Sequence, residues 1–237
     1  MLNNQKENKE FLGKEETGFA AVSDEGIMPL VDSNIEGDVL KVRKIPQRLA
    51  AKMAGINVGS TYEPIINNQT DAAAYQNALS KIRGNHSVSF SDDDCHIQAP
   101  SECARYALAT ALSINGVKKN GRKIQPQDID AGVTWANYGA TRVAQNRDCF
   151  DLTENEILLS VDAQLTMGRP VIVQCRKNWT DLGQHWAVVV AKSGSQYTVI
   201  DPAKTSSKDT TCFLTNMEYY TSSIGLTGYV ILSENLY

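Results

Sequence analysis

The sequence lacks the long apolar runs that mark membrane and secretory proteins. Nowhere in its 237 residues does a run approach the roughly 18 apolar residues of a membrane span. The opening stretch, MLNNQKENKEFLGKEETG, has no apolar core of the signal-peptide type. We therefore expect no membrane span and no secretory signal peptide. The expected location is the cytoplasm, or a host cell or the exterior reached through a specialised secretion system.

An excess of positive charge is missing as well. Lysine and arginine together number 23 against 27 aspartates and glutamates, which gives a formal net charge of -4. The one basic cluster, KVRKIPQRLAAK at 41–52, is too short to gather a polyanion by itself. We therefore expect no nucleic-acid partner.

Cysteines are few and unpatterned. Their odd number and irregular spacing, in a chain large enough to fold without disulfides, favour reduced thiols, and they are Cys95, Cys103, Cys149, Cys175 and Cys212. Structural burial is expected for the last three. Cys95 and His96 are adjacent, but no second close pair completes a zinc set, so we expect no metal site.

The N-terminal part of the chain is polar and then helical in pattern. Residues 1–40 are rich in Asn, Glu, Asp, Gly and Lys without a sustained hydrophobic period, so we expect a flexible segment. Residues 41–58 fit a short amphipathic helix broken at Pro46. The stretch DAAAYQNALSKIRG, at 71–84, predicts a second helix with Asp71 as its cap.

A further helix is predicted from the stretch IQAPSECARYALATALSING, at 97–116. Its apolar run follows a Pro-Ser pair and ends at Gly116, which are start and stop signals. If Ser101 caps the helix, Cys103 lies in the first turn. There, unpaired N–H groups and the positive end of the helix dipole favour a thiolate. A cysteine at that position is poised for nucleophilic chemistry.

The second half of the chain predicts a sheet and one more helix. Residues 125–141 are expected to form a short helix and a loop. In DLTENEILLSVDAQLTMGRP, at 151–170, Thr153 and Glu156 form a capping box and Gly168 ends the helix. Four β-branched runs then predict strands, namely VIVQC (171–175), HWAVVVA (185–191), YTVID (197–201) and GYVIL (228–232). Helices followed by strands indicate an α+β fold.

The two middle strands are expected to form a hairpin that brings two polar residues together. A three-residue loop at 192–194 suits a type I turn followed by a left-handed glycine. That loop pairs Ala191 with Ser195 and, further along, His185 with Asp201 on the same face. A two-residue loop would place the last two side chains on opposite faces, so the expectation depends on the turn.

Four residues together make a candidate thiol acyl-transfer site. Cys103 is the candidate nucleophile, His185 the base that takes and returns protons, and Asp201 the carboxylate that orients the imidazole. Gln98, which precedes the cysteine on the approach to the same helix, is the candidate donor to the oxyanion, alongside the Cys103 backbone N–H. This chemistry requires no cofactor.

The tryptophans receive less specific predictions. Trp186 projects to the face opposite His185 and is expected in the core. Trp135 and Trp179 fall in loop-like segments that could line a cleft.

The four candidate residues resemble the papain-like cysteine peptidase superfamily. Gln98 and Cys103 in QAPSEC, His185 in GQHWAVVV and Asp201 in VIDPA occur in the family's order. They are most similar to the peptidase domains that remove double-glycine leaders from bacteriocin precursors. The resemblance implies an oxyanion glutamine, a nucleophile, a base and an orienting aspartate at these positions. It also implies a central helix that carries the cysteine and packs on an antiparallel sheet that carries the histidine and aspartate.

The chain departs from the leader-removing domains in two ways. Glu102 and Ala104 flank Cys103, where those domains usually have Asp and Gly, and the chain lacks the membrane segments of the transporters that commonly carry them. We therefore expect a stand-alone papain-like protease acting on a protein or peptide, with its catalytic domain at 91–237 and a helical extension at 41–90. Two alternatives stay open, a glutamine deamidase or transamidase effector with the same triad and a catalytically silent binding module. The sequence does not define the oligomeric state.

Overall fold

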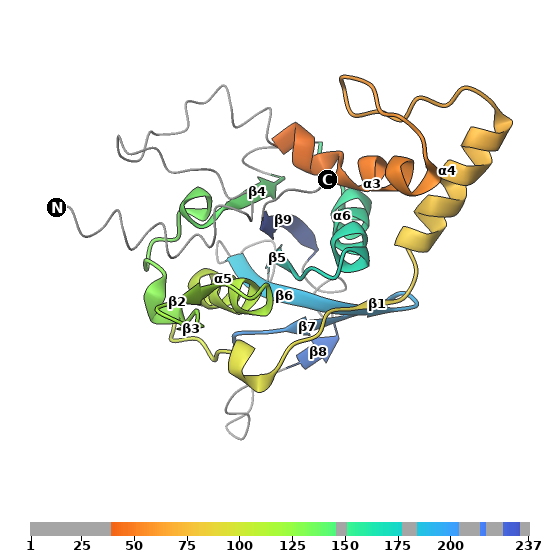
Figure 1. The fold of residues 1–237 in the computed structure, drawn as a ribbon. Coiled ribbons are helices and arrows are strands. Elements are labelled where there is room, and N and C mark those ends of the chain that lie inside the picture. The colour runs from red at the N-terminus through yellow and green to blue at the C-terminus, as the bar shows by residue number, and fades with distance from the viewer. Residues whose placement is uncertain (1–38, 146–150, 177–183, 204–213, 217–224, 233–237) are drawn as a thin grey trace.

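A computed structural model of the chain describes residues 39–145, 151–176, 184–203, 214–216 and 225–232. The flexible segment predicted at 1–40 lies almost wholly outside them. The described part combines helices with an antiparallel sheet, so the α+β class is confirmed (Figure 1). The α-helices are α3 (Ile45–Ala54), α4 (Gln69–Ile82), α5 (Cys103–Ile114) and α6 (Glu154–Thr166), and the 3-10 turns are η2 (Asp92–Asp94), η3 (Pro126–Asp128) and η4 (Trp135–Tyr138).

The main sheet contains all four predicted strands. Its order is β4-β9-β5-β6-β7-β8, with β1 paired to the far end of β6, and β2 and β3 form a separate hairpin. The bounds are β1 His86–Ser87, β2 Lys118–Lys119, β3 Arg122–Lys123, β4 Ala140–Ala144, β5 Val171–Arg176, β6 Gln184–Ser193, β7 Gln196–Ile200, β8 Leu214–Asn216 and β9 Leu226–Leu232. Just after β1, Val88 donates its N–H to the carbonyl of Val190 in β6 at 2.8 Å.

Alternate residues of the sheet face two separate cores. Trp186 and Val188 of β6 belong to the core under α5, whereas Ala187 and Val189 belong to the core under α6, as the alternation of side chains along a strand requires. Helices α3 and α4 pack beyond α6 (Figure 1) and add buried side chains such as Ile45 to the second core. The helical segment therefore shares a core with the sheet. The domain boundary at residue 91 stays a prediction.

Helix ends follow local chemistry closely. Thr153 and Glu156 form the predicted capping box at the start of α6. At α4 the cap is Asn68, whose side chain accepts the N–H of Asp71, so the prediction of Asp71 as the cap is wrong. An aspartate within the first turn instead interacts favourably with the helix dipole. Before α3 the helical path breaks at Lys44 rather than at the predicted proline, because a proline is tolerated in a first turn.

The stretch 125–141 is only partly as predicted. It contains the turns η3 and η4, but β4 begins at Ala140 as an edge strand on β9. The two strands lie close together at Gly228, where a Cβ atom would meet the carbonyl oxygen of Val143 at 2.6 Å. Glycine is thus required in β9 by the approach of a strand that the sequence pattern did not predict.

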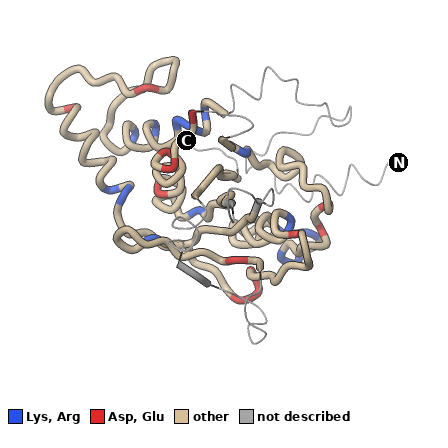
Figure 2. Tube along the Cα trace, turned by 180° about the vertical axis from the view of Figure 1, so that it is seen from behind, with Lys and Arg blue, Asp and Glu red and all other residues tan. Residues whose placement is uncertain are grey.

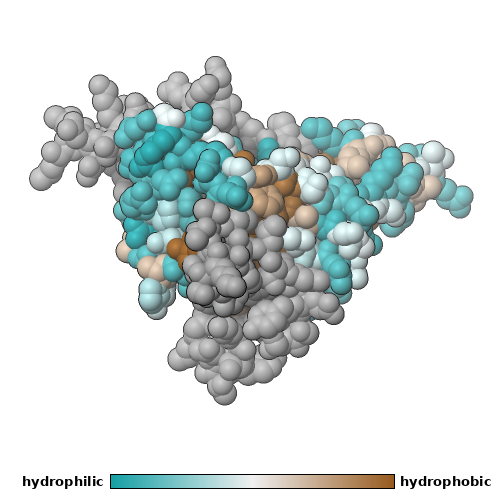
Figure 3. Space-filling model, turned by 90° about the horizontal axis from the view of Figure 1, so that it is seen from below, coloured by the Kyte–Doolittle hydropathy of each residue, from teal (hydrophilic) through white to brown (hydrophobic). Residues whose placement is uncertain are grey.

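The described surface is mixed in charge. Basic and acidic residues are interspersed over the helices and loops (Figure 2). In the view from below, a hydrophobic region reaches the surface between polar ones (Figure 3). The exposed large hydrophobic side chains of the described chain all belong to residues 40–66, and they are Leu40, Met53, Val58, Ile65 and Ile66. No helix in the part of the chain described here is long and apolar enough to cross a bilayer.

Candidate functional site

Cys103 is the first residue of α5. The N-cap is Glu102, whose carbonyl accepts the N–H of Tyr106 at 3.1 Å and whose side chain makes no capping hydrogen bond. The prediction of Ser101 as the cap is wrong, because Ser101 has a left-handed backbone (φ 66°) and belongs to the preceding turn. The half-buried cysteine still lies in the first turn, where the helix dipole favours negative charge.

His185 and Asp201 are hydrogen-bonded to each other. His185 is the second residue of β6, and Asp201 directly follows β7. The imidazole Nε2 lies 2.7 Å from the carboxylate Oδ1, and the two side chains are only 14% and 7% exposed. The same oxygen accepts the N–H of Ala203 at 2.7 Å. The carboxylate is therefore fixed by its own loop and can hold the imidazole in one orientation.

The hairpin that joins these residues differs from the predicted one. Its turn has two residues, 194–195, so that Ser193 pairs with Gln196. The predicted three-residue loop and its register are wrong. By itself, a two-residue turn would place His185 and Asp201 on opposite faces of the sheet.

A bulge in β6 restores the shared face. Ala191 pairs with Thr198, but Val189 pairs with Val199, which leaves Val190 as an extra residue. Beyond the bulge the register has moved by one, because two residues of one strand oppose one of the other. The candidate base and carboxylate then share a face as diagonal neighbours, within reach of a long side chain.

The charge of His185 is set by its two partners. Burial lowers its pKa, but hydrogen bonds to Asp201 and Cys103, together with electrostatic interactions with both groups, outweigh burial and raise the pKa to about 9. Since Nε2 bonds the carboxylate, the hydrogen bond to the cysteine side chain falls to Nδ1. At neutral pH the imidazole is therefore protonated, which is the form that pairs with a thiolate.

Gln98 lies beside the segment that follows Asp201. Its N–H donates to the carbonyl of Pro202 at 2.8 Å, which ties the approach to α5 to the end of β7. The side-chain Oε1 is buried and has no hydrogen-bond partner within the described residues. The structure thus brings Gln98 to the same end of the sheet as the other three residues. Its role as an oxyanion donor stays a prediction.

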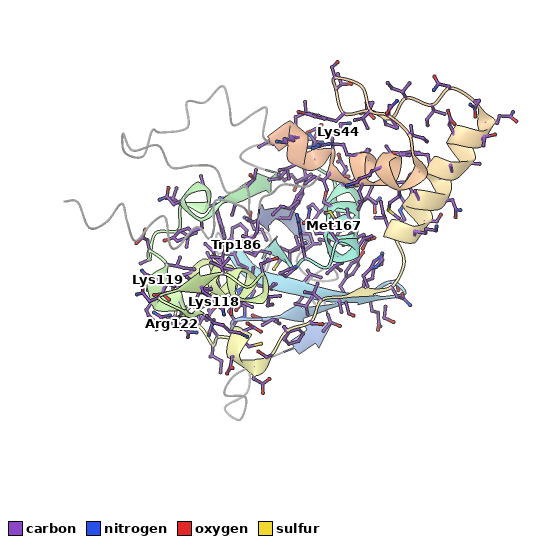
Figure 4. The ribbon with its side chains drawn as sticks, in the orientation of Figure 1. Lys44, Lys118, Lys119, Arg122, Met167 and Trp186 are labelled. Atoms are coloured by element: carbon purple, nitrogen blue, oxygen red, sulfur yellow. The ribbon has the colours of Figure 1, made fainter. Side chains whose placement is uncertain are left out.

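A tryptophan pair and an arginine lie on the α5 side of the sheet. Trp186 follows His185 and is 5% exposed, which confirms the predicted core position (Figure 4). Trp135 packs on it with ring centroids 4.9 Å apart. The guanidinium carbon of Arg142 also lies over the Trp186 ring, 5.3 Å from its centre. This arginine donates to Oε1 of the buried Gln174 at 3.1 Å. Sequence reasoning missed this arginine, although a glutamine inside the run VIVQC was a signal of a buried polar contact.

The remaining candidates do not form a second site in the described chain. No group of three or more His, Cys, Asp or Glu side chains is placed to hold a metal ion there. Cys175 is buried, as predicted. Cys149, Cys212 and Trp179 lie outside the described residues.

Comparisons with protein-family models, with curated proteins and with solved structures find no match for this chain. The papain-like assignment therefore stays a prediction, and its support comes from the arrangement of Cys103, His185 and Asp201 in an α+β fold.

Proposed function

We propose that the protein is a cysteine-dependent amide hydrolase, a stand-alone papain-like protease that cleaves a protein or peptide. One observation carries the proposal: His185 is hydrogen-bonded both to Asp201 and to Cys103, the first residue of a helix. A nucleophile, a base and an orienting group are the three roles that thiol acyl transfer requires. The packing of α5 on the antiparallel sheet supports the papain-like part of the proposal.

In the proposed acylation step, the Cys103 thiolate attacks the amide carbon. The tetrahedral oxyanion accepts hydrogen bonds from the Cys103 N–H and, in this proposal, from the Gln98 amide. As the C–N bond breaks, the leaving nitrogen takes the proton of His185. A thioester, a free amine and a neutral imidazole result, and Asp201 holds the ring in place.

In the proposed deacylation step, water replaces the amine. The oxygen of the water attacks the thioester carbon while His185 takes a proton from the water. The C–S bond then breaks, so the carboxylic acid leaves and the Cys103 thiolate and the imidazolium are restored. Every proton in the cycle passes through one imidazole, and no further reactant is needed.

The first test is the rate at which each cysteine is alkylated by iodoacetamide between about pH 5 and pH 9. In the wild type we expect Cys103 alone to react fast near pH 6, and in His185→Ala we expect it to slow sharply. The other cysteines provide the internal control. If Cys103 reacts in both proteins like an ordinary thiol, with a midpoint near pH 8.5, the proposal is wrong.

The second test asks what the site does to a substrate. Protein extracts are incubated with the wild type or with Cys103→Ala, and chain ends and intact masses are compared by mass spectrometry. New chain ends that require Cys103 support the protease. A mass gain of about one dalton per site without cleavage, the mark of glutamine deamidation, would replace the protease by a deamidase.

A further inference from the structure

We propose that Arg105 is a positioning residue that neutralises the charge of Glu102, the residue that directly precedes Cys103. The Nη1 of Arg105 donates to Oε1 of Glu102 at 3.0 Å. The inference rests on the proposed function, because it concerns how α5 sustains a reactive Cys103.

The guanidinium of Arg105 is held from two sides. Its Nε donates to the carbonyl of Pro126, the first residue of η3, at 2.7 Å and to that of Ile129, which directly follows η3, at 2.8 Å. The side chains of Arg105 and Glu102 are 20% and 27% exposed. The guanidinium of Arg105, in the first turn of α5, thus contacts both Glu102 and the loop at η3. These contacts fix the position of the guanidinium.

Glu102 has two opposite electrostatic effects. A carboxylate at a helix N-terminus stabilises the helix through the dipole. The same negative charge, one residue before Cys103, disfavours a second negative charge on the sulfur. The positive charge of Arg105 offsets the second effect and leaves the helix start intact.

Other charged groups also face the first turn of α5. His185 and Asp201 approach Cys103 from the sheet, and the loop around η3 carries Asp128 and Asp130. Asp128 is paired within its own loop region. None of these groups changes in the variants below, so differences among the variants report the Glu102–Arg105 pair alone.

The test compares a single and a double variant with the wild type by the alkylation of Cys103 with iodoacetamide across pH. Arg105→Gln keeps an amide donor for the loop carbonyls but removes the charge. We expect its profile to move to higher pH and its rate near pH 6 to fall a few-fold, up to about tenfold. In Glu102→Gln/Arg105→Gln the rate should return to within about twofold of the wild type.

The matched control is Arg105→Lys, which loses the planar fork but keeps the charge. We expect its profile to stay near that of the wild type. The inference is overturned if Arg105→Gln leaves the profile unchanged. It is overturned equally if the single and double Gln variants are slow to the same extent, because Arg105 would then act only through the carbonyls of Pro126 and Ile129.

The comparison of these variants is separate from the test of the proposed function. Alkylation of Cys103 in the Arg105 variants does not involve His185→Ala, so a failure of the inference is distinguishable from a failure of the proposed function. Thermal melting of each variant shows that folded proteins are compared. If Arg105→Gln does not fold, Glu102→Lys in the wild-type background tests the same charge effect, and the expected direction is a profile moved to lower pH.

Discussion

Strand β6 carries a cation–aspartate pair at each end, and the two pairs have different surroundings. At its start, His185 pairs with Asp201, and the side chains are 14% and 7% exposed. At its far end, Lys192 pairs with Asp162, and the side chains are 8% and 4% exposed. Burial and pairing are therefore similar at the two ends.

The difference lies in the third group. At the far end the hydroxyl of Tyr197 donates to the second oxygen of Asp162 at 2.7 Å, and Lys192 lies 5.1 Å from the tyrosine ring. Burial raises the pKa of both Asp162 and Tyr197. At the start of the strand the third group is Cys103, the candidate nucleophile. A buried ion pair is thus a poor indicator of catalysis unless a group that can react adjoins it.

The largest expected effect is the loss of the far pair. Asp162→Asn leaves Lys192 charged and buried without a counter-charge, which typically costs about 3–5 kcal/mol. We expect the free energy of unfolding in urea to fall by about that amount. Asp151→Asn, which weakens the ion pair of Arg43 with an aspartate whose side chain is 77% exposed, is the control and should cost much less, because an exposed ion pair contributes little to stability. If Asp162→Asn is as stable as the wild type, the Lys192–Asp162 pair does not stabilise the fold.

A smaller effect on stability is expected from a change of pH, through the His185–Asp201 pair at the start of β6. The pKa of His185 is raised from 6.5 to about 9. A group whose pKa rises on folding stabilises the fold fully below its unfolded pKa and loses that contribution as pH rises through the folded pKa. The free energy of unfolding should therefore fall by about 3 kcal/mol between about pH 6.5 and pH 9.5.

Asp201→Asn provides the control for that pH dependence. Without the carboxylate charge, less of the stabilisation of the imidazolium remains, so the decrease in unfolding free energy over the same pH range should shrink. Urea denaturation at several pH values measures both proteins. An equal slope in the two would show that this pair does not set the pKa of His185.

The smallest effect is expected for Tyr197→Phe. It removes one hydrogen bond to Asp162 and keeps the ring, which should cost about 1 kcal/mol. Alkylation of Cys103 should be unchanged, because the tyrosine lies at the end of the hairpin remote from it. A slower Cys103 in this variant would mean that the two ends of β6 are coupled.

Local features of the fold were the most predictable. The capping box of Thr153 and Glu156 needs only neighbouring residues, and the strand runs are fixed by composition and alternation. The α+β class followed from their order. Strand β4 was missed because the run ATRVA has no strong pattern and forms a strand only by pairing with β9, a contact distant in sequence.

For the candidate site, the proximity of Cys103, His185 and Asp201 was easier to predict than the geometry that brings them together. Cys103, His185 and Asp201 stand out because few side chains can act as nucleophile, base and orienting group. The hairpin register was predicted wrongly, because the turn is one residue shorter than expected and β6 contains the extra residue Val190. The two differences cancel in one respect, so His185 and Asp201 still share a face of the sheet. Neither difference leaves a clear mark in the sequence, because a bulge depends on the partner strand.

The contact between Val88 and Val190 limits how modular this protein is. The carbonyl of the bulged residue is satisfied by the chain leaving α4, and a buried carbonyl without a donor costs about 1–3 kcal/mol. A chain that began at residue 91 would lose this donor together with one wall of the α6 core. The helical segment could therefore not be exchanged for another without also affecting the alignment of His185 and Asp201.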